Sequence, residues 1–245
     1  MWDNLSNYEK KCLVQLEEYF DNQINASKTF FKNISFNGIS ISNVTKDVHI
    51  GKNVPKQHEC INYYIKMRNR EYINMLNRHI VDGIIAGSHL LDFEEYQGVQ
   101  GPIVALDRFL GESIPVVSTN HKIGGKLAAE ELIRNNCRCV LQIQGARIVD
   151  SPSHERHYEF ERCMKKHGVT VYSHEMDWND FDYGQYDVMA DMLMDKYPDI
   201  DGIFAADMVA IACIRQLLKR KKKVPRDVKV VAYDGTYVAK VGVMN

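Results

Sequence analysis

The chain has 245 residues, of which 45% are hydrophobic and 26% charged, and this is the ordinary composition of a folded globular protein. Its formal net charge of -1 leaves no overall excess that would concentrate it on nucleic acid or anionic lipid. Six cysteines without CxxC spacing indicate a reducing compartment, and no apolar stretch has the length of a signal peptide or a membrane span, so a cytoplasmic protein is expected.

The first part of the chain gives mixed signals. Residues 5–22 carry apolar residues at helical spacing, which predicts an amphipathic helix. Residues 34–41 have strand character interrupted by Asn37-Gly38, a pair that favours a hairpin turn, and the polar segment 42–57 predicts a loop. No strand precedes the first helix, although an α/β lobe would normally begin with one.

From residue 59 onward, helices and strands alternate. The spacing of apolar residues predicts helices at 59–79, 124–135, 156–167, 183–196 and 209–220, and strands at 81–86, 102–106, 114–118, 139–143, 169–172, 202–205 and 228–232. Short β-branched strands between helices are typical of parallel sheets with right-handed crossovers. Gly168 is expected to end the helix at 156–167.

One pattern occurs twice: an amphipathic helix, an Asp-Gly turn at Asp82 or Asp201, and a short apolar strand. Two related halves predict an α/β protein with two lobes, which we place at residues 1–138, atypical over 1–58, and at residues 139–245. Ligands of open α/β sheets bind beyond the carboxyl ends of the strands. The repeated strands end near Ser88 in one copy and at Asp207 in the other.

No catalytic or metal-binding pattern is complete. Gly124-Gly125-Lys126 lacks the remaining residues of a phosphate loop, and Gly87-Ser88-His89 is not a GxSxG elbow. His154 and His157 lack thiolate or carboxylate partners at ligand spacing, so we expect surface roles for them. The chain is therefore predicted to be neither an enzyme nor a holder of metal or cofactor.

A basic run, residues 219–223, leaves two interpretations open. It lies at the carboxyl end of a predicted helix, where lysines favour the helix dipole and are solvated. The alternative is a contact with nucleic acid.

Six ordered segments between Glu59 and Tyr237 resemble the ligand-binding region of the lactose and galactose repressor family of bacterial transcription regulators, most closely its sucrose operon repressors. They are REYINML..HIVDGIIAGSH, GPIVALDR, IPVVSTNHKIGGKLAAEEL, HERHYEFERCMKKHGV, DIDGIFAADMVAIA and VPRDVKVVAYDGTY. The resemblance implies an α/β fold of two Rossmann-like lobes, of the periplasmic-binding-protein type, that close over a sugar. It also implies a homodimer.

The resemblance is incomplete at both ends. Nothing before Glu59 matches the family's helix-turn-helix, its opening strand is absent, and after Tyr237 there is no return to the first lobe. We therefore expect an incomplete first lobe in a truncated or degenerate repressor of marginal stability. Operator DNA is expected as a partner only if a DNA-binding element is supplied.

The resemblance also implies a ligand set, and the residues that match its positions are Arg156, Asp234, Asp207, Trp178, Asn120 and Ser88. Arg156 matches the arginine that holds sugar hydroxyls, whereas Asn120 and His121 stand where the family has Asp-Asn. A sugar presents paired hydroxyls and an apolar face, which suit bidentate partners and one aromatic ring. The alternatives are that Asp234 caps the next segment and that Trp178 belongs to the core.

The expected function is therefore a sugar-responsive repressor whose effector is a sugar or sugar phosphate, such as a sucrose or fructose derivative. The alternative is a stand-alone cytoplasmic sugar-binding or dimerisation module without operator contact.

Overall fold

A computed structural model describes residues 6–8, 10–11, 69–87, 96–148, 150–177 and 183–241. The chain divides into two compact units, residues 1–103 and 104–245. The hairpin and loop expected at 34–57, and most of the helix expected at 5–22, lie outside the described residues. The lobe boundary expected between residues 138 and 139 stays a prediction.

The first unit contains a described helical segment, residues 69–77, and strand β1 (Ile84–Ala86). Leu76 is buried, and its side chain occupies the space beside Gly101, where an added Cβ would lie 2.4 Å from Leu76 Cγ. The backbone N–H of Ile84 donates to Pro102 O at 2.9 Å. The helix and strand predicted here are therefore confirmed over their described parts.

The second unit is built on parallel strands, as predicted. Strand β2 (Ile103–Leu106) pairs with β3 (Val116–Val117), with Ala105 opposite Val116. A larger sheet has the order β5-β4-β6-β7, and its strands are all parallel. Their bounds are β4 (Cys139–Gln144), β5 (Thr170–Glu175), β6 (Gly202–Ala205) and β7 (Lys229–Ala232).

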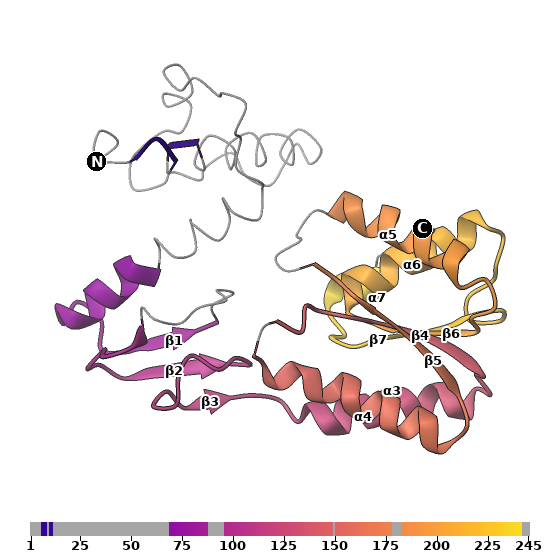
Figure 1. The fold of residues 1–245 in the computed structure, drawn as a ribbon, viewed down its shortest axis with the longest axis horizontal. Helices are drawn as coiled ribbons and strands as arrows, with labels where there is room; N and C mark the ends of the chain where they lie inside the picture. The colour runs from indigo at the N-terminus through magenta and orange to yellow at the C-terminus, as the bar shows by residue number, and fades with distance from the viewer. Residues whose placement is uncertain are drawn as a thin grey trace. The chain divides into compact units, whose positions relative to one another are not determined.

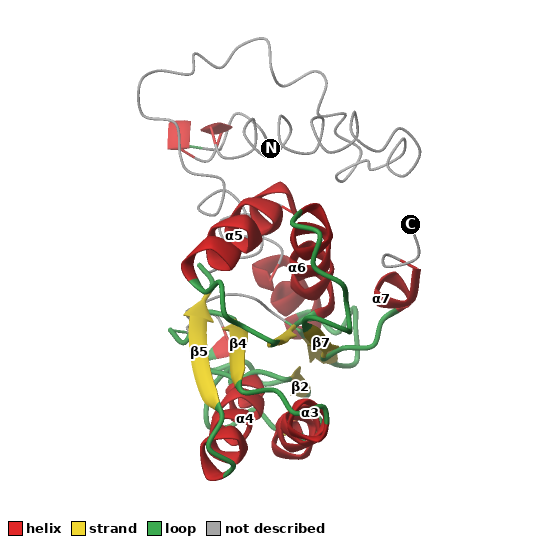
Figure 2. Ribbon diagram, turned by 90° about the vertical axis from the view of Figure 1, so that its right-hand side faces the viewer, coloured by secondary structure: helices red, strands yellow, loops and turns green. Residues whose placement is uncertain are grey.

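Helices cover both faces of the larger sheet (Figures 1 and 2). Helices α3 (His121–Arg134) and α4 (Glu155–Lys166) lie on one face, and α5 (Tyr183–Lys196) and α6 (Asp207–Lys219) on the other. The short helices η4 (Pro152–His154) and α7 (Tyr237–Val241) precede α4 and follow β7. The helices predicted here are all present; Gly168, with φ 70, follows α4 in the left-handed conformation that glycine favours.

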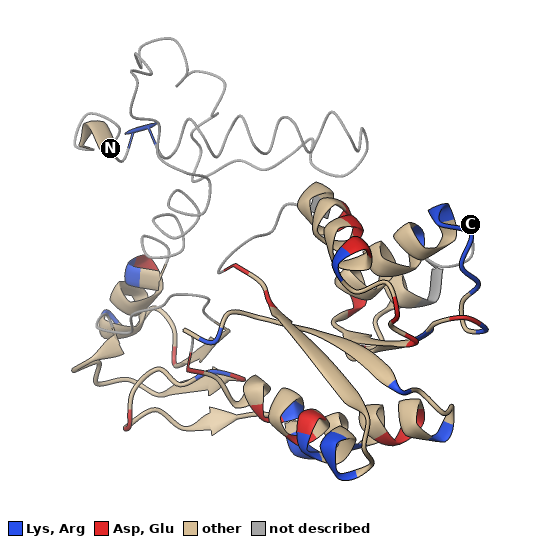
Figure 3. Cartoon of the chain, turned by 45° about the vertical axis from the view of Figure 1, so that its right-hand side comes forward, with Lys and Arg blue, Asp and Glu red and all other residues tan. Residues whose placement is uncertain are grey.

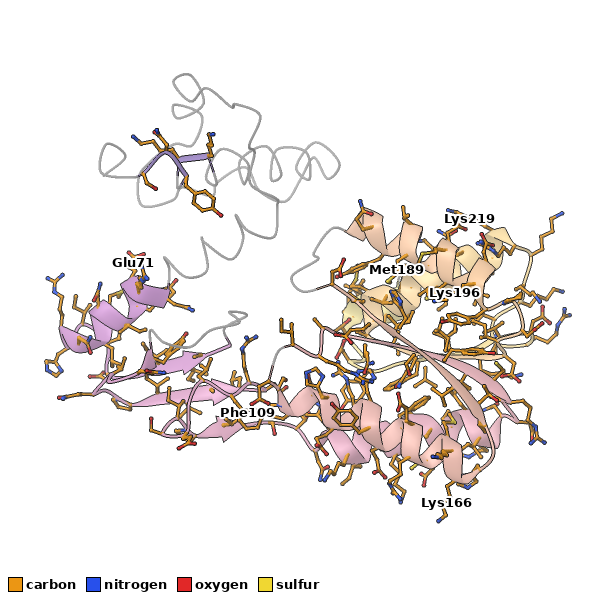
Figure 4. The ribbon with its side chains drawn as sticks, viewed as in Figure 1. Glu71, Phe109, Lys166, Met189, Lys196 and Lys219 are labelled. Atoms are coloured by element: carbon orange, nitrogen blue, oxygen red, sulfur yellow. The ribbon has the colours of Figure 1, made fainter. Side chains whose placement is uncertain are left out.

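Alternate residues of the central strands fill two separate cores. In β6, Ile203 and Ala205 pack with α5 and α6, whereas Phe204 packs with α3 and α4. A strand buried on both faces sends successive side chains to opposite sides, so its sequence is continuously apolar. Met189 of α5, labelled in Figure 4, packs against the first of these cores.

Ion pairs join α5 to α6 and to the residue that follows it, and Figure 3 shows both acidic and basic positions along these helices. Arg215 Nη2 lies 2.8 Å from Asp187 Oδ2, and Arg220 contacts both Asp191 and Asp195. These groups are partly or largely exposed, so each pair contributes about 1 kcal/mol or less. The apolar core, not the ion pairs, holds the two helices on the sheet.

Helices α4, α5 and α6 end in lysine, at Lys166, Lys196 and Lys219 respectively (Figure 4). The residues 221–223 that follow α6 are exposed, which fits the solvated helix end among the two interpretations of the basic run. Because the helices run antiparallel to the strands, these lysines lie beyond the amino ends of the strands. No helix in the described ranges is long and apolar enough to cross a membrane.

Candidate functional site

A pocket of about 560 Å³ lies in the second unit, beyond the carboxyl end of β7. This volume is within the range of small-molecule sites, roughly 300–1,000 Å³. The lining combines apolar and polar groups, and its polar side chains are Asp107, Thr119, His121, Arg156, Tyr233 and Asp234. The pocket thus lies at the carboxyl ends of strands, where the sequence predicts a ligand site.

Arg156 and Tyr233 both line the pocket. Tyr233 directly follows β7, and Arg156 lies in the first turn of α4, which follows β4 in the chain. Parallel strands end at the same edge of a sheet, so these distant residues meet there. The guanidinium carbon of Arg156 lies 4.3 Å from the Tyr233 ring centroid, a cation–π contact that orients the arginine.

His157 holds the other side of Arg156. Arg156 Nε donates to His157 Nε2 at 3.2 Å, and His157 Nδ1 lies 3.2 Å from Gln142 Oε1. An amide oxygen only accepts, so Nδ1 carries the ring proton and Nε2 is free to accept. Burial, followed by the charge of Arg156, lowers the pKa of His157 to about 3, so its ring is neutral near pH 7.

The expected surface role of His157 is wrong. Its side chain is only 3% exposed, and its ring lies 5.4 Å from that of Phe204, between centroids. The spacing of histidines showed no metal site, but it could not show that this position faces the sheet. His157 is a buried support for Arg156.

Among the described residues, the hydrogen bond found for the Arg156 guanidinium is the one from Nε, and its terminal nitrogens have no partner there. In the part of the chain that the structure describes, no carboxylate forms an ion pair with this half-buried guanidinium. A guanidinium has five N–H donors, and only the one on Nε is used by His157. The arrangement is therefore a fixed arginine fork that lines the pocket.

His121, the first residue of α3, organises a second polar group in the pocket. Its Nε2 lies 2.9 Å from Asp107 Oδ1, and its Nδ1 lies 3.1 Å from the Tyr233 hydroxyl oxygen. Thr119 Oγ1 is slightly farther, at 3.3 Å from Nε2. His121 is 4% exposed. In the sequence, His121 stood out only as a departure from the family, because the helix was predicted to begin at residue 124 and not at His121.

Two glycines of α3 allow the helix to approach these residues closely. A Cβ on Gly124 would lie 2.5 Å from the Tyr233 hydroxyl oxygen, and one on Gly125 would lie 2.0 Å from Arg156 O. Both distances are shorter than any real carbon contact, so larger residues do not fit. The close approach of α3 to Tyr233 and to α4 therefore accounts for the two glycines, whose sequence does not fit a phosphate loop.

Of the predicted ligand residues, the pocket brings together Arg156 and Asp234. Asp234 is exposed, and its Oδ2 accepts from the backbone N–H of Asp207 at 3.4 Å. Trp178 and Ser88 lie outside the described residues. Their roles as ligand contacts stay predictions.

Asp207 is engaged with the turn after Asp234. It is buried, and its carboxylate accepts from the backbone N–H groups of Gly235 and Thr236, at 3.1 and 2.6 Å, and from the Thr236 hydroxyl. Burial alone raises the pKa of Asp207, but the hydrogen bonds from Thr236 and Gly235 outweigh it and leave the pKa below its ordinary value. Asp207 therefore supports the turn that carries Asp234.

Asn120 caps α3. Its side-chain Oδ1 accepts a hydrogen bond from Ile123 N at 3.1 Å, and the residue is exposed and is not part of the pocket lining.

Among the described residues, no group of three or more His, Cys, Asp or Glu could hold a metal ion, and the described cysteines are free thiols.

Comparison with known proteins gives a consistent family. Residues 129–244 match the model of a periplasmic binding protein-like domain. The ribose operon repressor of Halalkalibacterium halodurans is 31% identical over 169 residues, which are 69% of this chain and 50% of the repressor. The sucrose operon repressor of Streptococcus mutans is 32% identical over 171 residues, 69% of this chain and 52% of its own length. The chain thus spans about half the length of these curated relatives.

Solved structures agree with this result. A periplasmic binding protein/LacI transcriptional regulator from Alkaliphilus metalliredigens, complexed with D-xylulofuranose, matches with a TM-score of 0.59 and 25% identity, over 71% of this chain and 64% of that one. A transcriptional regulator of the LacI family from Burkholderia phymatum matches with the same TM-score and identity, over 76% and 66%. The predicted fold class is confirmed.

Proposed function

The chain contains a periplasmic binding protein-like domain of the LacI type of transcription regulator, and from this we propose that its pocket binds an uncharged sugar as an effector. The observation that supports this most is the Arg156 guanidinium, held between Tyr233 and His157, whose terminal nitrogens have no partner among the described residues. Such a fork bonds adjacent hydroxyls in a defined geometry, and Asp234 adds an acceptor nearby.

The charges of the pocket favour a neutral sugar over a sugar phosphate. Among the described lining residues, Arg156 is the one cation, and Asp107 and Asp234 contribute two carboxylates. An ionised phosphate group accepts hydrogen bonds but does not donate them, and nearby carboxylates repel it. We therefore narrow the expected effector to the uncharged sugars, in keeping with the ribose and sucrose operon repressors and the D-xylulofuranose complex among the similar proteins.

Calorimetry with D-ribose, D-xylulose, D-fructose and sucrose tests the proposal. One of these sugars should bind the wild-type chain, and Arg156→Ala should weaken that binding by roughly a hundredfold while the circular dichroism spectrum stays nearly unchanged. Arg147→Ala is the matched control, because Arg147 lies near Glu161 and Glu175 and is not part of the pocket lining. Wild-type affinity in Arg156→Ala would remove the arginine from the site.

Repression of transcription, assembly as a homodimer and a place in the cytoplasm belong to the same proposal. The matched part covers about half of the relatives, so the chain's own contact with operator DNA has to be measured. A gel shift with operator fragments separates the alternatives. Specific retardation that a bound sugar changes supports a repressor, whereas sugar binding without retardation supports a stand-alone sugar-binding module.

A further inference from the structure

We propose that His121 is a positioning residue that sets the hydrogen-bond polarity of the pocket. Its ring donates through Nε2 to Asp107 and accepts through Nδ1 a hydrogen bond from the Tyr233 hydroxyl, so that Tyr233 and Asp107 offer a ligand acceptors and not donors. The inference rests on the proposed function and specifies the ligand chemistry: this side of the pocket selects hydroxyl groups that donate.

The protonation pattern follows from the partners of the His121 ring. A carboxylate accepts only, so the short contact of 2.9 Å between His121 Nε2 and Asp107 Oδ1 requires a proton on Nε2. A neutral imidazole carries one ring proton, which leaves Nδ1 as an acceptor. Two hydroxyls lie within reach of Nδ1, Thr119 Oγ1 at 3.4 Å and the Tyr233 hydroxyl at 3.1 Å, and we assign the donor to the closer one, Tyr233.

The charged and titratable groups around His121 come from several elements. Asp107 follows β2, and its carboxylate faces His121 Nε2. Arg156 of α4 lies on the Tyr233 ring, which itself stacks on His121 with centroids 6.0 Å apart. His121 is almost completely buried, and Asp234 belongs to the same pocket lining.

A ligand in this pocket meets hydrogen-bond donors on one side and hydrogen-bond acceptors on the other. Arg156 supplies donors, while the Tyr233 oxygen, with its proton already engaged, presents lone pairs. A sugar hydroxyl both donates and accepts hydrogen bonds, so neighbouring hydroxyls can accept from Arg156 and donate to Tyr233 at the same time. An ether or a phosphate oxygen cannot donate to the Tyr233 side. His121 thereby makes the pocket selective through the orientation of its neighbour Tyr233.

The ring nitrogens of His121 give a direct test that needs no ligand. Nitrogen-15 correlation spectra of the histidine side chains at pH 7.5 should show His121, identified by its loss in His121→Gln, with a proton on Nε2 and a bare Nδ1. A proton on Nδ1 alone, or on both nitrogens, would overturn the proposal. Thermal melts of the variants show whether each one is folded.

Ligand binding gives the second readout, with D-ribose as the probe. Glutamine can donate to Asp107 and accept from Tyr233, so His121→Gln should keep the affinity within about threefold, whereas His121→Leu should weaken it roughly tenfold. Equal affinity in the folded leucine variant contradicts the proposal. If D-ribose fails to bind even the wild-type chain, the choice of effector is wrong, and the nitrogen spectrum still decides the role of His121.

Discussion

Gly125 of α3 lies against the main chain of Arg156 in α4, so close that a Cβ on Gly125 would be 2.0 Å from the Arg156 carbonyl oxygen. The two helices touch through backbone at this point. Arg156 is thus constrained at three places. Its main chain packs against Gly125, its guanidinium lies over the Tyr233 ring, and its Nε donates a hydrogen bond to His157. The geometry of the pocket depends on a residue without a side chain.

Gly125→Ala should destabilise the chain by at least about 2 kcal/mol, because the new methyl group can only be placed if α3 moves away from α4. Urea unfolding at neutral pH measures the change. Gly145→Ala is the control, since a Cβ there meets nothing within 4 Å, and it should change the free energy of unfolding by less than about 0.5 kcal/mol. Equal effects of the two substitutions would refute the packing account.

Arg156→Lys should weaken sugar binding by at least roughly tenfold although the charge is kept. Lysine lacks the planar fork and the Nε donor to His157, so neither the paired hydrogen bonds nor the fixed orientation survives. Calorimetry with the sugar that binds the wild-type chain checks this. Retention of full affinity would mean that charge alone is what Arg156 contributes.

His157 should make the stability of the chain depend on pH in a defined window. Its pKa in the folded chain is about 3, below the ordinary value of 6.5, so between these values the unfolded chain binds one more proton than the folded chain. Stability therefore falls as the pH falls through this window, by about 1.4 kcal/mol per pH unit. The loss from pH 7.5 to pH 5 should be about 2 kcal/mol greater in the wild-type chain than in His157→Gln. Parallel pH profiles of the two chains from urea unfolding would contradict the buried neutral ring.

Asp207 should matter more for stability than as a direct ligand. Asp207→Ala leaves the donors of Gly235 and Thr236 without their acceptor, and we expect a loss of about 2 kcal/mol in the free energy of unfolding. Asp207→Asn keeps a carbonyl oxygen and should lose less, with sugar affinity within a few-fold of wild type. If the asparagine variant is stable but no longer binds sugar, Asp207 is a ligand contact after all.

Asn120→Ala should cost about 1 kcal/mol of stability through the loss of the helix cap on Ile123 N. Asn120→Asp keeps an acceptor at the start of α3 and should be as stable as the wild-type chain. Sugar affinity should be unchanged in the aspartate variant. A large loss of affinity there would restore Asn120 to the ligand set.

Much of the second unit could be predicted because the information is local. The helix at Tyr183–Lys196 and the strand at Gly202–Ala205 have the predicted bounds, since hydrophobic periodicity is a property of a few neighbouring residues. Element ends were less certain: α6 begins at Asp207 rather than at Val209, because the reach of the helix depends on how its first turn meets the segment after β7. Arg156 was found through its resemblance to a family position, and it lies in the pocket.

By itself, the amino-acid sequence determined the alternation of helices and parallel strands, the repeated Asp-Gly motif and the chemical types available at strand ends. The tertiary structure alone decided which of those groups meet. His121 and Tyr233 are separated by 112 positions and become partners only when α3 and β7 reach the same edge of the sheet. His157 is a buried support rather than a surface residue, and Asp207 bonds the turn at Thr236, because burial and hydrogen-bond partners are set by long-range packing, which no local pattern of residues encodes.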